Sequence, residues 1–173
     1  SLDKIFSEID RQYNIFSTNN YVKSFMNSKN FVNNGLETYQ ISERIYDLMV
    51  NTINTSNYLH SIYLYSSLNN YVISSESSNY LDIFYSRDLI FRTIEQSNQK
   101  NSSYYKIDNS RKCIIISYPI QYNLNNKYDG YFFVNIDISK LEEAVLGNNL
   151  TKNEKIYIIN KEGNIVYSND HNT

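Results

Sequence analysis

The feature that most constrains this chain is a change in the period of its apolar residues after the first third of the sequence. Over residues 1–56 the apolar side chains recur every three or four positions, which is typical of amphipathic helices that bury one face. From residue 61 onward they alternate with period two, which is typical of half-buried β-strands. The order predicts helices followed by a sheet, in an α+β arrangement.

Two long helices are predicted in the first part. One covers residues 3–28 and is interrupted at the polar cluster Ser17-Thr18-Asn19-Asn20, because such residues favour turns over helix interiors. The other covers residues 36–53 and follows Asn33-Asn34-Gly35. Both carry an apolar stripe, so we expect them to pack on one face of the sheet.

Five antiparallel strands are predicted in the second part. Residues 61–67 and 71–75 form a hairpin, and residues 81–96 then form a short helix. Because strands that neighbour in sequence usually pair, the five strands should form one sheet. The three remaining strands are predicted at 103–107, 112–122 and 130–138. A further helix is predicted at 138–146, and a last hairpin at 155–160 and 164–168.

Alternation within the strands predicts two chemically different sheet faces. The first is aliphatic and should be buried against the helices, through Phe132, Val134, Ile136, Ile62 and Leu64. The second is aromatic and polar. Two interpretations of the second face remain open: it is either the half-solvated side of the sheet or a concave ligand pocket.

Composition and motifs argue against several functional classes. The net charge is −2 and no basic stretch occurs, so a nucleic-acid footprint is absent. No phosphate-binding or zinc-protease motif occurs, and His60 and His171 are too far apart in sequence to suggest a metal site. The single cysteine, Cys113, is expected to be an apolar strand residue. We therefore expect a non-catalytic chain without cofactor or metal.

The chain has no apolar run of 18 residues, so none of it is predicted to span a membrane. It starts at Ser1 and ends after a strand-like segment, and both ends resemble cuts within a longer protein. We expect transmembrane and output segments in the flanking parts.

Three stretches resemble, in order and spacing, the PAS-like Cache domains of bacterial sensor kinases and chemoreceptors. They are SIYLYSSLNNYVISS (61–75), DIFYSRDL (82–89) and KYDGYFFVNIDISKLEEAV (127–145). A fourth, IYIINKEGNIVYS (156–168), resembles the opening hairpin of a second, membrane-proximal module. The similarity is greatest to double-Cache sensor kinases and AraC-like transmembrane regulators of Gram-positive bacteria. The resemblance implies an N-terminal helical region (1–56), a membrane-distal Cache domain (57–149) and the start of a truncated second module (150–173).

The resemblance also implies a ligand site. Amino-acid-binding members hold the ligand with an Arg-x-Trp pair, a Tyr and an Asp. Arg87 falls at the arginine, Tyr104 or Tyr105 at the tyrosine and Asp137 at the aspartate, while Leu89 replaces the tryptophan. An arginine can pair with a carboxylate and an aspartate can accept an ammonium group. The aromatic lining of this predicted site is Tyr63, Tyr65, Tyr131 and Phe133.

The function implied is an extracytoplasmic signal-input domain of a transmembrane receptor, such as a histidine kinase, on the outer face of a Gram-positive plasma membrane. It would bind an amino-acid-like small molecule and form a homodimer through its N-terminal helix. Two alternatives remain open. A pilin-like adhesive subunit would need a continuously apolar first helix, whereas this one carries Asp3, Lys4 and Glu8. A cytoplasmic PAS domain would not need so long a helical entry.

Overall fold

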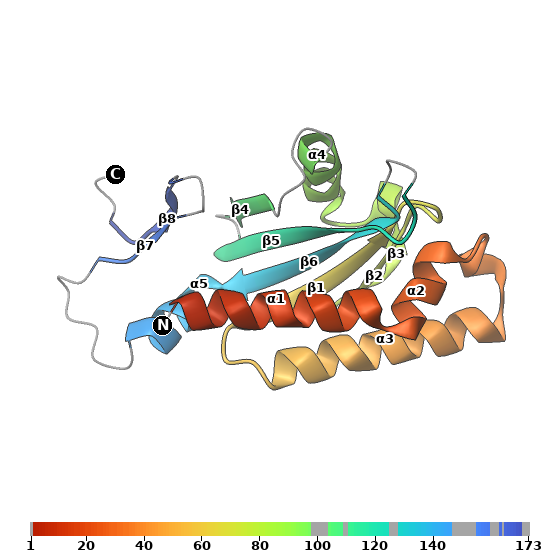
Figure 1. Ribbon diagram of the computed structural model, residues 1–173, viewed down its shortest axis with the longest axis horizontal. Coiled ribbons are helices and arrows are strands. Elements are labelled where there is room, and N and C mark those ends of the chain that lie inside the picture. The colour runs from red at the N-terminus through yellow and green to blue at the C-terminus, as the bar shows by residue number, and fades with distance from the viewer. Residues whose placement is uncertain are drawn as a thin grey trace.

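The computed structural model describes residues 2–97, 104–108, 111–124, 128–146, 155–159, 163 and 165–170. Three N-terminal helices lie against one face of an antiparallel sheet, and a shorter helix lies on the opposite face (Figure 1). The predicted α+β class is confirmed. No helix in these ranges is long and apolar enough to cross a bilayer.

The helical layer consists of α1 (Leu2–Thr18), α2 (Asn20–Asn27) and α3 (Leu36–Asn54). The predicted interruption lies at Asn19, which has an extended backbone and whose side chain accepts hydrogen bonds from the amides of Tyr21 and Val22. A side chain that accepts from the first free amides of a helix starts a new helix. Asn19 therefore divides the first predicted helix into two.

The main sheet has the order β3-β2-β1-β6-β5-β4, and every pair in it is antiparallel. Its five longer strands match the five predicted ones. The added edge strand β3 has only two residues, too few for any periodicity to reveal. The strands are β1 (Leu59–Ser66), β2 (Tyr71–Ser74), β3 (Asn79–Tyr80), β4 (Tyr104–Asp108), β5 (Cys113–Ile120) and β6 (Gly130–Asp137).

The aliphatic face of the sheet forms the larger core. Ile62, Leu64, Phe132, Val134 and Ile136 are all buried in one apolar cluster with residues of α1, α2 and α3, as predicted. The helices contribute large side chains to it, among them Ile9, Phe16, Phe25, Ile45 and Met49. Burial of these opposed apolar surfaces is what fixes the helices to the sheet.

Three tyrosine hydroxyls add directional contacts between α1 and the β5 side of the sheet. Tyr13 donates to the carbonyl of Pro119 at 2.9 Å, and Tyr118 donates to Asp10 at 2.7 Å. Tyr122 donates to the carbonyl of Ser17 at 2.8 Å. Each ring packs in the core while its hydroxyl finds a partner, so these contacts determine where α1 lies along the sheet.

Gly130 begins β6, opposite Ser66 of β1 and next to the Met26 side chain of α2. A Cβ atom there would lie 2.0 Å from the Tyr65 carbonyl oxygen and 2.5 Å from the Met26 sulfur. Neither distance is possible for a real side chain, so only glycine allows β1, β6 and α2 to meet at this point.

On the opposite face lie the 3₁₀ turn η2 (Leu81–Ile83) and α4 (Arg87–Ser97), and α5 (Ile138–Leu146) follows β6 directly. The last hairpin, β7 (Tyr157–Ile159) and β8 (Ile165–Ser168), forms a separate two-stranded sheet. Ile156 and Ile158 are nevertheless buried in the larger core, whereas Ile165 is exposed. The division of the chain into three parts stays a prediction.

We expect Ile136→Ala to lower the free energy of unfolding by about 2–5 kcal/mol, because the change leaves a cavity in a packed core. Urea denaturation would measure the loss. Ile83 is 68% exposed, so the matched change Ile83→Ala should cost less than about 0.5 kcal/mol. Equal midpoints for the two variants would contradict the assigned core.

Candidate ligand-binding site

The second face of the sheet carries the predicted aromatic residues side by side. Tyr63 pairs with Phe133 and Tyr65 with Tyr131 across β1 and β6, and all four are buried. They form a second apolar cluster with Leu81, Phe84, Leu89 and Ile90, which belong to η2, α4 and the segment between them. The aromatic end of this face is therefore covered by the chain itself rather than half-solvated.

The same face becomes polar toward the other end of β1 and β6. Ser61 lies opposite Asn135, and Cys113 lies opposite Asp137. Side chains on one face are spaced by two residues, so Asn135 and Asp137 continue the row that Phe133 begins. Polar side chains from three loops converge on this end.

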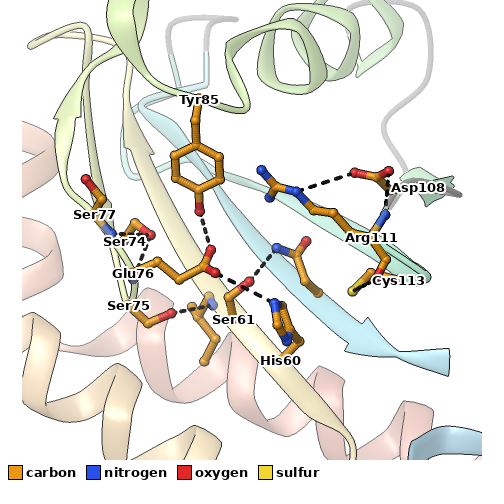
Figure 2. A network of polar contacts seen from close by, with 12 residues as sticks. His60, Ser61, Ser74, Ser75, Glu76, Ser77, Tyr85, Asp108, Arg111 and Cys113 are labelled. Atoms are coloured by element: carbon orange, nitrogen blue, oxygen red, sulfur yellow. Dashed lines mark hydrogen bonds and ion pairs between the residues drawn. The ribbon is translucent and has the colours of Figure 1, made fainter. Parts of the chain in front are cut away.

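Tyr63 connects the sheet to these loop residues. Its hydroxyl donates to Glu76 at 3.2 Å and accepts from Arg111 at 3.1 Å. Tyr85 donates to the same Glu76 carboxylate (Figure 2). The Arg111 guanidinium carbon lies over the Tyr85 ring, 4.5 Å from its centroid. We refer to His60, Ser61, Tyr63, Glu76, Tyr85, Arg111 and Asn135 as the polar cluster.

Local hydrogen bonds hold the loop members of the polar cluster in place. The Ser74 hydroxyl accepts from the amide of Glu76 at 3.0 Å and so fixes the loop that follows β2 (Figure 2). Asp108 accepts from the amide of Arg111 at 3.3 Å in the turn between β4 and β5, and its carboxylate lies 3.9 Å from the Arg111 Nε. These contacts within each loop help to order the segments that carry Glu76 and Arg111.

Asn135 has an unmet hydrogen-bonding requirement. The residue is only 2% exposed, and its Nδ2 donates to the Ser61 hydroxyl at 2.7 Å. Its Oδ1 accepts no hydrogen bond from any residue that the structure describes. A buried acceptor without a donor costs about 1–3 kcal/mol, so Asn135 Oδ1 calls for a donor from outside the described residues, such as a water molecule or a ligand.

The electrostatics of this end are dominated by carboxylates. Burial first, and then the nearby carboxylates of Asp137, Asp108 and Glu76, raise the pKa of the Cys113 thiol to about 11, while Arg111 acts in the opposite direction. Burial likewise raises the pKa of Tyr63 above its usual value. Tyr85 is raised mainly by burial and then by its hydrogen bond to Glu76. Both phenols therefore remain neutral donors at physiological pH.

The polar residues that the sequence predicted for the ligand site do not all lie together in the structure. Asp137 lies on the expected face, where its Oδ1 accepts from the Lys140 amide at 3.0 Å and caps α5. Arg87 begins α4 with an exposed side chain that donates to the Asp82 carbonyl, and no described contact joins it to the polar cluster. Tyr104 and Tyr105 lie in β4 opposite Ser117 and Ile116, but their side chains are outside the described part of the chain.

Sequence reasoning did not identify Glu76, Tyr85, Arg111 or Asn135 as site residues. Asn135 could have been found, because it alternates with Phe133 and Asp137 in a strand whose neighbouring residues are apolar. The other three lie in turns or at a helix entry, where no periodicity predicts which side chains will meet. Within the described ranges, no group of His, Cys, Asp and Glu could hold a metal ion.

A cleft of about 520 Å³ lies elsewhere, between α5 and β8. It is lined by Lys112, Ile138, Ser139, Glu142, Tyr167, Ser168 and Asn169. Tyr167 already donates to Glu142 across it. None of these lining residues has a buried polar atom left without a partner, so the polar cluster is the stronger candidate.

No protein-family model matches the chain, and no curated protein does. Solved structures do. The ligand-binding domain of the Campylobacter jejuni chemoreceptor Tlp3 with L-norvaline is 15% identical, with a TM-score of 0.54, covering 98% of this chain and 64% of that one. The 4-methylisoleucine complex of that domain gives 17% identity, a TM-score of 0.49 and coverages of 95% and 64%. The first of these similarities establishes a shared fold, and the chain spans 64% of that domain.

We expect Cys113 to resist alkylation in the folded protein. With a pKa of about 11, only about 0.1% of the thiol is ionised at pH 8, and the residue is buried. Iodoacetamide should react slowly at pH 8 and rapidly in urea, with the reaction followed by mass spectrometry. Between pH 8 and 10 the native rate should rise with the thiolate fraction. Equal rates with and without urea would contradict this environment.

Proposed function

We propose that this chain is a small-molecule-binding input domain of a bacterial transmembrane receptor, and that the ligand binds at the polar cluster. The observation that carries the proposal is the buried Asn135 Oδ1, which lacks a donor among the described residues. It lies where three loops converge on the sheet. The fold shared with a norvaline-binding receptor domain supports the same class of function.

The route from ligand to output follows from the two faces of β1 and β6. Ser61 and Asn135 belong to the polar cluster, whereas Ile62 and Ile136 lie next to them in sequence and pack against the helices. A ligand that draws the loops of Glu76, Tyr85 and Arg111 inward also shifts β1 and β6, because the polar cluster includes residues of both strands. Signalling then requires only that the ligand bind more tightly to one position of α1 and α3 than to the other.

The finer form of the proposal rests on the resemblance seen in the sequence. It assigns the domain to the outer face of the plasma membrane, ahead of a kinase or regulator in a Gram-positive bacterium, with α1 as a homodimer contact and an amino-acid-like ligand. The domain itself would be non-catalytic. The full-length gene product tests this form directly, because flanking transmembrane segments and a downstream output module must be present.

The ligand site can be tested with a pair of arginine variants. A ligand at a hundred times its dissociation constant should stabilise the protein by about 2.7 kcal/mol, which a thermal-shift screen of metabolites would detect. Arg111→Ala should remove most of the shift, since it opens the polar cluster. Arg87→Ala should leave the shift intact if the ligand binds at the polar cluster. The reverse result would move the site to Arg87, and no shift with any compound would contradict the proposed function.

A further inference from the structure

Resting on the proposed ligand site at the polar cluster, we propose that the ligand is an organic amine, bound through its ammonium group, in place of the amino-acid-like ligand that the sequence resemblance implies. The site then discriminates against the same molecule carrying a carboxylate. The inference comes from the charges and hydrogen-bonding capacity left at the polar cluster after its internal contacts are counted.

The one guanidinium at the site is already engaged. Arg111 lies beside the Asp108 carboxylate, donates to Tyr63 and stacks on Tyr85. A ligand carboxylate would have to compete with the Asp108 carboxylate and the Tyr63 hydroxyl for Arg111. The charge of this arginine is thus already balanced in part within the protein.

Two carboxylates at the same end lack a strong cationic partner. Among the residues that the structure describes, Glu76 has His60 but no Lys or Arg within ion-pair distance. The His60 Nε2 lies 3.6 Å from the carboxylate, and about 40% of each side chain is exposed. Asp137 has no Lys or Arg within ion-pair distance among the described residues. Its carboxylate accepts a hydrogen bond from the Lys140 amide at the start of α5. The site therefore favours an incoming positive charge and disfavours a negative one.

The hydrogen-bonding groups at the site fit the same class of ligand. Asn135 Oδ1 needs a donor, and the Glu76 and Asp137 carboxylates are acceptors only. The two phenol hydroxyls already donate to Glu76, so neither remains to donate to a ligand carboxylate. An ammonium group has three donors and no acceptor, which matches this set. The aromatic rings beside the cluster, of Phe84 and Phe133, would suit the apolar part of the ligand.

Matched compounds test the proposal by isothermal titration calorimetry on the whole chain. Each set holds an amino acid, the amine formed by removing its carboxylate and the acid formed by removing its amino group. Suitable sets are norvaline with butylamine and pentanoate, and tyrosine with tyramine and 3-(4-hydroxyphenyl)propanoate. In at least one set the amine should bind at least about tenfold more tightly than the amino acid, and the acid should not bind.

Glu76→Gln provides the decisive variant, because it removes the charge and keeps the shape. It should weaken amine binding at least about tenfold. The matched control is Glu43→Gln on α3, where a remote, exposed carboxylate also accepts a tyrosine hydroxyl, from Tyr39 at 2.7 Å. Binding by that variant should be unchanged. Asn135→Asp should tighten amine binding where the variant folds, as judged by circular dichroism.

The outcomes separate this inference from the proposed function. Amino acids that bind as tightly as their amines, with affinity lost in Arg111→Ala, would overturn the amine assignment and leave a ligand site at the polar cluster. Amine binding that Glu76→Gln does not weaken would also overturn it. Failure of these sets and of the metabolite screen alike would overturn both proposals.

Discussion

The pairing of β1 with β6 is the contact on which the rest of the structure depends. These strands lie at the centre of the sheet, and each contributes alternate residues to opposite faces. Ile62 and Val134 face the helices, while Tyr63 and Phe133 face η2 and α4. A slip of one residue would exchange the two faces, so the same register secures the helical core and assembles the polar cluster.

The two faces of the sheet differ in whether their buried polar groups all find hydrogen-bond partners within the described protein. The helical face is filled by aliphatic and aromatic side chains, and tyrosine hydroxyls such as Tyr13 and Tyr118 find partners within the protein. The opposite face is apolar beneath α4 but ends in Asn135, whose buried carbonyl has no described donor. The larger packed core therefore lies on one side of the sheet, and the acceptor without a described donor lies on the other. This separation suits a domain that responds to a ligand without losing its core.

The carboxylates around Cys113 show how a site can acquire a charge preference without any motif. Asp108 precedes Arg111 by three residues in a tight turn, and this local arrangement engages the only arginine of the polar cluster. Glu76 comes from a different loop and Asp137 from the end of β6. After burial, which is the largest cause, these carboxylates also raise the pKa of the Cys113 thiol. The preference arises from which charges pair locally and which do not.

The sequence alone determined the helical and strand periods, the order of the elements and the composition of each sheet face, since these follow from repeats of 3.6 and 2 residues. It thereby predicted the burial of Ile136 and the common face of Tyr63 and Phe133. Only the tertiary structure decided which loop residues meet. Arg87 and Arg111 both follow turn-like segments, yet only Arg111 reaches Tyr63. The physical reason is that turn side chains carry no periodic signal, and their partners are distant in sequence and set by the strand order.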